Sequence, residues 1–583
     1  MTNTRFLLAF FFLLTGPITL AQSVQVSFPV ARLVVQRGAD GNGRLYVSGQ
    51  FTGLADRVEA QLTPVSAGVG TATGWQTVQN NPTNNFFAGS IAGAGGWYVL
   101  TVRTMQGSNA VSQTTVQPVG IGEVFVTAGQ SNSRGLGIGD NDLGTATDRV
   151  SAIDTINHSY PPGAPALVSS GDPLPYPMLK PLTAGKRIFP MAESSWGWGE
   201  LGDYVVNRFN VPVVFYVAGW DASTVENWIN TANGIPTANR YNDQYNWPNL
   251  QPYTNLKNVL QYYGNVGGMR AVLWHQGEAE FGDANSGSIP DYANRLTNLI
   301  QKTRQDFGGR TLPWVVARAS FDGSTNRPDV ISKQQEVINS VVGVFQGPLN
   351  DTIVNRNANG VDVHFKNSQR PVTHPQYYLN PNTIPADMGL SRFARNWNAS
   401  LDNAFFQNAT PILPEQFVAT GALAATIHPA DSLRVNFIAF GNFNPGNSWQ
   451  LQLLDNQGRF VQILNSAATG ALLRAKLPDG LQTGTFRVRV VGTSPVVAGG
   501  PSNLFTLGTP PSCAGVVQQT IRAGSWNDPT VWSCGQIPTA TNPVELRHRI
   551  TLPDGYVANT LKISLSTGGS LVYGLGARLV LGQ

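Results

Sequence analysis

A short apolar run that ends in a serine-containing turn constrains the fold of this chain most strongly. Residues Val124 to Ala128 are apolar apart from one threonine, which is typical of a buried β-strand. The run breaks at Gly129 and places Ser131 just past the strand end. A hydroxyl held there by a rigid element points toward any cleft above the sheet, where a nucleophile would be positioned. Gly, Gln, Ser and Asn are also ordinary turn residues, so a simple polar turn remains the alternative.

Two later stretches favour the nucleophile. They read Val272-Leu-Trp-His-Gln-Gly-Glu-Ala-Glu280 and Gly360-Val-Asp-Val-His-Phe-Lys366. With Gly129-Gln-Ser-Asn132 they resemble, in order and separation, the blocks of the SGNH (GDSL-like) hydrolases, and most closely the sialate O-acetylesterase and acetylxylan esterase group. In that group the serine block reads Gly-Gln-Ser-Asn, a later block Trp-x-Gln-Gly-Glu, and the last block carries Asp and His. The resemblance covers roughly residues 118 to 405 and implies a carbohydrate O-acetylesterase.

The middle of the chain has the pattern of an α/β layer fold. The 583 residues are too many for one hydrophobic core, so several domains are expected. Between residues 118 and 408, apolar strand-length runs alternate with helical patterns, which favours a parallel sheet. The resemblance implies a three-layer SGNH-hydrolase domain. Active sites in such sheets lie outside the carboxyl ends of the strands, and Ser131 and Gln276 each follow an expected strand directly. The expected strands are 124–127, 211–217, 269–274 and 312–317, and the expected helices are 292–306 and 334–342.

The flanking segments have strand patterns separated by Gly, Asn and Asp clusters. Residues 22–117 and 409–508 are each predicted to be a β-sandwich. Residues 509–583 are predicted to be a linker and a small β-rich domain, either the start of a β-solenoid or a β cap. We expect Trp526 and Trp532 to fill the core of this last domain rather than stack on sugars. For the N-terminal sandwich a supporting role is favoured, with glycan binding as the alternative.

The N-terminus indicates an exported protein. Arg5 precedes an apolar run over residues 6–14, and small residues precede a cleavage site after Ala21. This pattern predicts a secretory signal peptide over residues 1–21, because the apolar run is too short to span a bilayer. We expect a secreted or cell-surface protein without a transmembrane segment. In such a chain the two cysteines, Cys513 and Cys534, predict one disulfide in preference to a metal site.

Composition disfavours a nucleic-acid partner. The chain has 38 Lys and Arg against 34 Asp and Glu, a net charge of +4, and no concentrated basic run. Charged residues make up 12% of the chain, about half of the usual ~25%. A nucleic-acid-binding domain would show a basic patch or a recognisable motif, and neither is present in the sequence.

A serine nucleophile needs a base, and His364 is the expected one. It lies in the block that carries the histidine in the resembled family, and it closely follows an acid, Asp362. That family usually has the acid three residues before the histidine, but position 361 is valine here. In an extended segment, residues two apart face the same side, so Asp362 can contact His364. Asp351 is the alternative third member. His275 is expected to be a packing residue.

The oxyanion of an acyl-transfer reaction requires hydrogen-bond donors. The backbone N–H of Ser131 and the side-chain amide of Gln276 are the expected donors. The resemblance implies a further N–H from a Gly-Gly-Thr block, which here reads Asp221-Ala-Ser223. The Ala222 N–H would serve if φ there is negative, and Gly219 is the alternative. The resemblance also implies that Glu278 supports the site and is not the nucleophile.

These features together predict a secreted serine esterase that removes O-acetyl groups from a glycan or polysaccharide, without a metal or another cofactor. Two other functions stay open. One is a non-catalytic glycan-binding or adhesion protein with a decayed esterase site. The other is a hydrolase of the same fold that acts on lipid or other esters. The sequence does not indicate which sugar carries the acetyl group.

Overall fold

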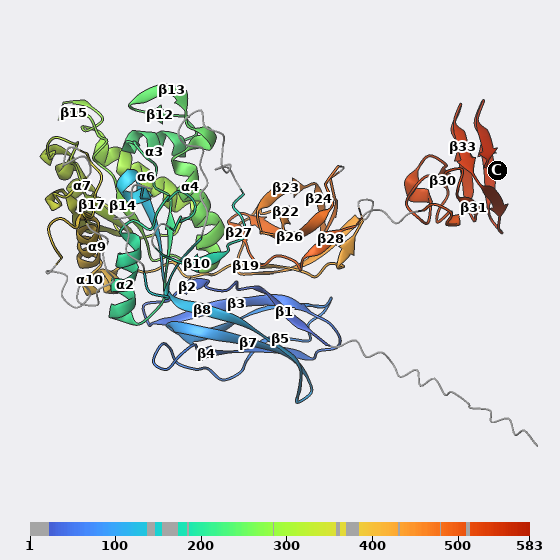
Figure 1. Ribbon diagram of the computed structural model, residues 1–583, viewed down its shortest axis with the longest axis horizontal. Coiled ribbons are helices and arrows are strands. Elements are labelled where there is room, and N and C mark those ends of the chain that lie inside the picture. The colour runs from blue at the N-terminus through green and yellow to red at the C-terminus, as the bar shows by residue number, and fades with distance from the viewer. Residues whose placement is uncertain are drawn as a thin grey trace, which may run out of the picture.

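The computed structural model describes residues 22–136, 146–153, 173–183, 186–283, 285–356, 362–368, 384–428, 432–478, 480–508 and 513–582. The segment predicted to be a signal peptide, residues 1–21, and the residues predicted to link the last domain, 509–512, lie outside this part. The protein is multidomain and rich in strands, with both parallel and antiparallel sheets (Figure 1). In the described residues no helix combines the length and apolarity needed to cross a membrane.

The N-terminal unit consists of two antiparallel layers. One sheet has the order β1-β3-β6, and in the other β5 pairs with β4, β4 with β7, and β7 with β8. Their inward-facing residues, such as Leu45, Val47 and Leu100, are fully buried, as expected for the alternating pattern of a two-layer β-sandwich. The strands are β1 (Val24–Phe28), β2 (Val34–Gln36), β3 (Asn42–Phe51), β4 (Arg57–Pro64), β5 (Gln76–Asn80), β6 (Phe86–Ala94), β7 (Gly96–Gln106) and β8 (Asn109–Gly129).

Strand β8 belongs to two units at once. Its first half pairs antiparallel with β7, and its second half pairs with parallel strands of the central unit (Figure 1). The predicted boundary between residues 117 and 118 therefore falls inside a continuous strand. Near this point the carboxylate of Glu123 is fully buried and accepts hydrogen bonds from Arg270, Arg37 and Gln36. These contacts tie β2 and the start of β14 to β8.

The central unit is built on a largely parallel sheet. Its strand order is β10-β9-β11-β8-β14-β17-β18, and all neighbours are parallel except β10 and β9. The sheet strands are β9 (Val150–Ile153), β10 (Leu179–Pro181), β11 (Val213–Val217), β14 (Ala271–His275), β17 (Trp314–Arg318) and β18 (Val344–Leu349). Two small hairpins are β12 (Ala238–Asn239) with β13 (Asn242–Asn246), and β15 (Gly282–Asp283) with β16 (Ser286–Gly287).

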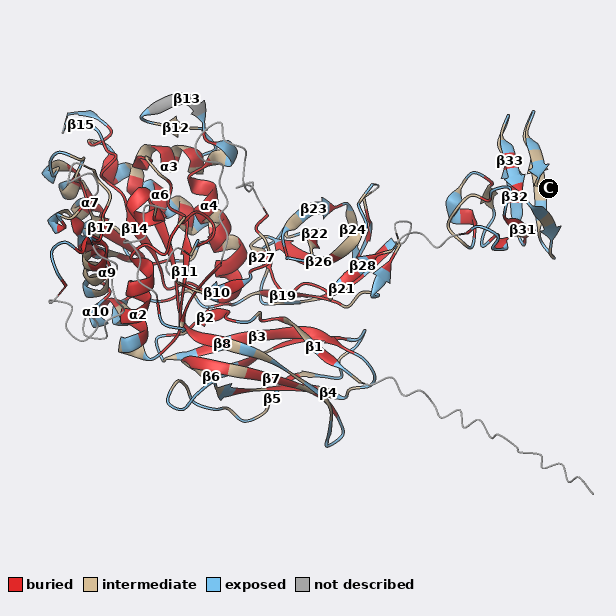
Figure 2. Ribbon diagram, in the orientation of Figure 1, coloured by how far each residue is buried: buried red, intermediate tan, exposed pale blue. Residues whose placement is uncertain are grey.

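Helices cover both faces of this sheet. The helical segments are α1 (Ser131–Arg134), α2 (Trp198–Phe209), α3 (Val225–Ala232), η1 (Pro248–Leu250), α4 (Tyr253–Asn258), η2 (Val259–Gly264), α5 (Asn265–Gly267), α6 (Tyr292–Asp306), α7 (Pro328–Ser340), η3 (Asn350–Thr352), α9 (Gly389–Ser400) and α10 (Asn403–Asn408). Residues of α3, α4, α6 and α7 pack on one face, and residues of α2, α9 and α10 pack on the other. Figure 2 shows the buried residues concentrated in the sheet and on the helix surfaces that face it. The expected helix 292–306 is confirmed, and the helix expected at 334–342 begins earlier, at Pro328.

A second β unit follows, with two mainly antiparallel sheets ordered β19-β21-β25-β24 and β20-β28-β26-β22-β23. It packs against the N-terminal unit, where the Phe417 ring lies 4.8 Å from those of Phe28 and Tyr46. Its strands are β19 (Phe417–Thr420), β20 (Thr426–Ile427), β21 (Ser432–Phe440), β22 (Trp449–Asp455), β23 (Phe460–Leu464), β24 (Ser466–Thr469), β25 (Leu472–Lys476), β26 (Gly484–Thr493), β27 (Val496–Ala498) and β28 (Phe505–Leu507).

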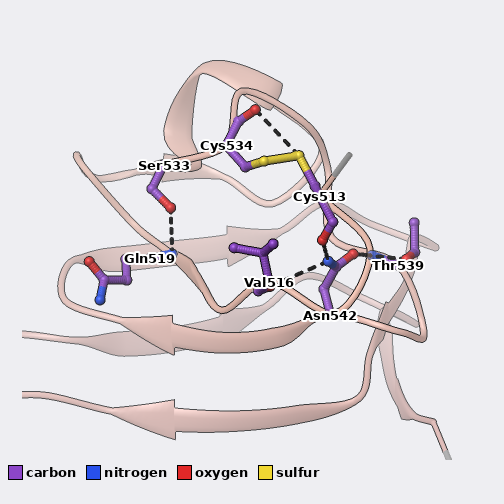
Figure 3. The surroundings of a disulfide bond; sticks show 7 residues. All are labelled: Cys513, Val516, Gln519, Ser533, Cys534, Thr539 and Asn542. Atoms are coloured by element: carbon purple, nitrogen blue, oxygen red, sulfur yellow. Dashed lines mark hydrogen bonds between the residues drawn. A yellow bond between two sulfur atoms is a disulfide. The ribbon is translucent and has the colours of Figure 1, made fainter. Parts of the chain in front are cut away.

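The C-terminal segment stacks short parallel strands in three groups, β29-β31-β34, β30-β32-β35 and β33-β36, the arrangement of a β-solenoid. Trp526 and Trp532 are buried in its core, as expected. A disulfide joins Cys513 and Cys534, whose Cα atoms are 6.2 Å apart (Figure 3). The segments are β29 (Gln518–Gln519), β30 (Gly524–Ser525), η6 (Pro529–Val531), β31 (Pro543–Leu546), β32 (Arg549–Leu552), β33 (Val557–Thr560), β34 (Lys562–Leu565), β35 (Ser570–Tyr573) and β36 (Arg578–Leu581).

Candidate active site

Ser131 is the first residue of helix α1, at the carboxyl end of β8. Gly129 makes the turn between them, with a φ of +124° and no room for a side chain, because a Cβ there would lie 2.0 Å from the His275 carbonyl oxygen. The N–H of Gln130 donates to that same oxygen at 3.0 Å. The first N–H groups of an α-helix have no acceptor within the helix, so the Ser131 N–H is a suitable donor for a developing negative charge.

The structure brings Ser131, His364 and Asp362 together. Nε2 of His364 lies 2.8 Å from Oγ of Ser131, and Nδ1 of His364 lies 2.7 Å from a carboxylate oxygen of Asp362. The hydrogen bond from His364 holds the pKa of Asp362 below its usual value, so this carboxyl stays ionised. The histidine can accept the serine proton while the carboxylate fixes the ring and stabilises its charged form. The alternative acid, Asp351, instead accepts hydrogen bonds from the N–H groups of Ser320 and Phe321.

The residue after the nucleophile holds the histidine loop. The side chain of Asn132 is fully buried and donates to the Val363 carbonyl oxygen at 3.0 Å. Its Oδ1 accepts the N–H of Phe365 at 3.3 Å. Asn132 therefore binds the backbone on both sides of His364. Its amide also donates to Glu278 at 2.9 Å, which links the serine block to the second motif block.

A buried polar cluster lies beneath this contact. Glu278 is almost fully buried, and one of its oxygens lies 3.5 Å from Nδ1 of His275. Burial lowers the pKa of His275, so its ring stays neutral between Phe365 and Phe393. His275 thus packs inside the domain, as expected. Glu278 contacts Asn132 and His275, which places it in support of the nucleophile turn.

The prediction that Gln276 supplies an oxyanion donor is not supported by the geometry. Its amide nitrogen donates to the Ser223 carbonyl oxygen at 3.2 Å and to Glu280 at 2.7 Å, so both amide hydrogens are used. The same Glu280 oxygen accepts the N–H of Val225 at the start of α3. Gln276 therefore joins two loops behind the site, and its side chain is fully buried there.

The segment 219–223 lies beside the nucleophile turn and departs from the expected backbone at one position. The N–H of Trp220 donates to the Gly129 carbonyl oxygen at 2.9 Å, two residues before Ser131. Gly219 packs so tightly that a Cβ would lie 2.3 Å from Oγ of Ser133. At Ala222 the condition for a donor N–H, a negative φ, is not met, because φ there is +54°. Alanine in this conformation costs about 1–2 kcal/mol, which glycine would avoid.

Asp221 takes the place of a glycine in the resembled block, and the structure shows what it contacts. Its carboxylate pairs with the buried guanidinium of Arg134. Burial raises the pKa of Asp221, while the charges of Arg134 and His364 oppose that rise. Arg134 also pairs with Glu193 at 2.6 Å. The carboxylate at position 221 is thereby paired with the last residue of α1 rather than left as an unpaired charge.

Sequence reasoning assigned no role to three residues that shape this site: Asn132, Arg134 and Arg356. Asn132 and Arg134 lie within three residues of Ser131 in the sequence, and this proximity alone could have suggested a role in the site. Arg356 donates to the Val363 carbonyl oxygen and lies over the Phe365 ring. Nothing in its sequence neighbourhood indicates this role. In the described residues, no group of three or more His, Cys, Asp or Glu side chains is arranged to hold a metal ion.

Comparison with known families bears on part of this site. Residues 227–365 match the family model described as carbohydrate esterase, sialic acid-specific acetylesterase. The predicted resemblance to carbohydrate esterases is confirmed. This carbohydrate-esterase segment includes Gln276, Glu278, Asp362 and His364, and Ser131 precedes it. The match favours a carboxylic ester hydrolase that acts on a glycan.

Solved structures give only weak similarities. An acetyl xylan esterase, Est2A, from the rumen bacterium Butyrivibrio proteoclasticus has 11% identity and a TM-score of 0.21, covering 62% of this chain and 88% of that one. A β-glycosidase from Bacteroides vulgatus has 10% identity and a TM-score of 0.20, and the match covers 86% of this chain and 67% of the glycosidase. Murine CEACAM1b has 17% identity and a TM-score of 0.11. The match covers 16% of this chain and 44% of CEACAM1b, which is less than half of the length of that protein. Scores this low carry no argument about the fold. No curated protein matches the chain significantly.

Proposed function

We propose that this protein is a serine esterase of the SGNH type that removes O-acetyl groups from carbohydrates. One observation carries the proposal: Ser131, His364 and Asp362 form a continuous hydrogen-bonded chain, with spacings of 2.8 and 2.7 Å, at the carboxyl end of the central parallel sheet. Two of these three residues lie inside the segment that matches the carbohydrate esterases. Geometry and family similarity thus support the same chemistry.

In the proposed reaction Ser131 Oγ attacks the acetyl carbonyl carbon while Nε2 of His364 takes the hydroxyl proton. The N–H groups of Ser131 and Gly219 stabilise the tetrahedral oxyanion. His364 then returns the proton to the sugar oxygen, which leaves as a hydroxyl and leaves an acetyl group on Ser131. Water attacks the acetyl carbonyl carbon while His364 takes its proton, and His364 then returns the proton to Oγ of Ser131 as acetate departs. Asp362 holds the imidazole in the productive tautomer throughout.

The arrangement of the base and acid supports the SGNH type over an ordinary α/β-hydrolase. In the latter the nucleophile stands in a Gly-x-Ser-x-Gly elbow, and the acid and histidine come from separate loops. Here Asp362 and His364 are two residues apart on one loop, and Ser133 stands where the second glycine would be. Helices on both faces of the parallel sheet fit the three-layer architecture that this type implies.

We also propose that the protein is exported. The pattern of residues 1–21 supports a signal peptide. The Cys513–Cys534 disulfide fits an oxidising compartment outside the cytosol.

The test is hydrolysis by wild type and Ser131→Ala. Acetate, butyrate and octanoate esters of 4-nitrophenol report acyl preference, and acetate release is measured from acetylated xylan and from O-acetylated sialosides. We expect preference for acetate and a loss of about 10⁴-fold or more in kcat for Ser131→Ala. Preference for octanoate would indicate a lipid esterase. Absence of turnover by wild type on all these substrates would favour a binding protein instead.

A further inference from the structure

Two loops meet over the end of β8, next to the nucleophile. Strands β11 and β14 are the two neighbours of β8 in the sheet. The chain after β11 leads through α3 to Arg240 and Tyr241, and the loop directly after β14 carries Ala279 and Phe281. Since parallel strands end at the same edge of a sheet, both loops lie at the edge that holds Ser131.

Arg240 joins these loops. Its guanidinium carbon lies 4.6 Å from the centre of the Tyr241 ring and 4.8 Å from the centre of the Phe281 ring. It also donates a hydrogen bond to the Ala279 carbonyl oxygen. The N–H of Ala279 in turn donates to the side chain of Gln130, the residue before the nucleophile, at 3.0 Å. The cluster of Arg240, Tyr241 and Phe281 is thus fixed to the nucleophile turn.

The rings of Tyr241 and Phe281 are both exposed to solvent. Tyr241 is 66% exposed and Phe281 is 40% exposed. In the described part of the chain, one other large aromatic residue is exposed to this degree, Tyr573 in the C-terminal segment. Single exposed apolar residues are normal on a protein surface, but two rings placed together beside an active site favour a binding role. Within the described residues, no carboxylate pairs with Arg240.

We propose that Arg240, Tyr241 and Phe281 form a subsite for a sugar ring of the substrate. The apolar C–H face of a pyranose packs against an aromatic face, and aromatic rings supply large contact area with defined geometry. Arg240 offers guanidinium N–H groups, arranged in a rigid fork, to the ring hydroxyl or carboxylate oxygens. This inference rests on the proposed function and adds a specificity element to it, since a bare acetate ester has no group to fill the subsite.

The experiment compares a substrate that fills the subsite with one that cannot. Vinyl acetate carries the acetyl ester but no ring. Acetylated xylo-oligosaccharides and O-acetylated sialyllactose carry both. Wild type, Tyr241→Ala, Phe281→Ala and the double variant are assayed on each, with Tyr573→Ala as the matched control for removal of an exposed tyrosine. We expect KM for the oligosaccharide that wild type cleaves to rise about threefold to tenfold per ring, with more in the double variant.

Turnover of vinyl acetate by the same variants should stay within about twofold of wild type, because the chemistry at Ser131 is untouched. An equal loss on vinyl acetate and oligosaccharide would overturn the subsite and indicate a structural role for the rings. Unchanged KM values for the oligosaccharides would overturn it as well. If wild type cleaves neither substrate class, the esterase proposal itself fails, and that result is distinct from failure of the subsite.

Discussion

Replacing Asn132 by alanine tests how the structure holds its base in place. The substitution removes three hydrogen bonds, to Val363 O, Phe365 N and Glu278. The Val363 carbonyl oxygen keeps a donor in Arg356. The Phe365 N–H loses its acceptor, and one Glu278 oxygen loses its donor. A buried polar group left without a partner costs about 1–3 kcal/mol. We therefore expect the free energy of unfolding to fall by about 2–6 kcal/mol.

The kinetic effect should be larger than a loss of folded protein can explain. Asn132 fixes the backbone on both sides of His364, so its removal lets the imidazole move from Oγ of Ser131. A displacement of about 1 Å in a catalytic group can cost about 10²-fold in rate. We expect kcat for 4-nitrophenyl acetate to fall about 10²-fold with KM nearly unchanged. The rate at which a fluorophosphonate modifies Ser131 should fall in parallel, because that reaction also needs His364 as the base.

Asn258 provides the control. It is fully buried in α4, and its amide has no hydrogen-bond partner in the described structure, waters aside. Asn258→Ala should leave kcat and the modification rate close to wild type. Urea titration defines the concentration range in which each variant is folded. If folded Asn132→Ala retains the wild-type kcat and modification rate, the positioning role of Asn132 is refuted.

Three further outcomes follow from the same structure. Asp362→Asn should lower kcat about 10³-fold while the protein stays folded, because the amide can no longer hold the His364 tautomer; a steady-state assay with urea unfolding distinguishes this from misfolding. Burial raises the pKa of Glu200 from 4.5 to about 7, so the folded state binds more protons than the unfolded state between these values. The free energy of unfolding should therefore fall by about 3 kcal/mol as pH rises through this window. In Glu200→Gln the free energy of unfolding should differ less between pH 5 and pH 8. Cys513→Ser opens a loop with a sequence separation of 21 and should cost the C-terminal segment about 3 kcal/mol, without loss of esterase activity, as measured by proteolysis and acetate release.

The four middle strands of the central sheet, β11, β8, β14 and β17, were predictable because both of their faces are covered. Val213 to Val217 are all fully or almost fully buried, which matches their nearly continuous apolar sequence. Helix α6 was also predictable, since its apolar residues recur at helical spacing. Helix α2 was not predicted, because Gly199 and Gly202 weaken its local propensity. Tertiary burial compensates: Gly202 packs so closely on Val150 that a Cβ would lie 2.6 Å from that side chain.

The resemblance indicated His364, and Asp362 was the nearest acid in the sequence, but the residues that hold this pair in place could not be predicted. Asn132 contacts Val363 and Phe365 across more than 230 residues of sequence, and no local pattern encodes a contact at that distance. The continuity of β8 across the predicted boundary at residues 117 and 118 was missed for a different reason. Pro118, Gly120 and Gly122 are residues typical of a break, but the strand continues through them. The role of Gln276 was not predicted correctly. Its position at a strand end places it near the site, but it does not show that its amide donates to Ser223 and Glu280 instead.

The most direct test of the central claim is detection of the acetyl-enzyme. Wild type is mixed with 4-nitrophenyl acetate, quenched in acid within milliseconds, digested, and analysed by mass spectrometry. The account predicts an acetyl group on Ser131 that decays as turnover proceeds and is absent in Ser131→Ala. Turnover that persists in Ser131→Ala, with no acetyl group found on Ser131 in wild type, would contradict it.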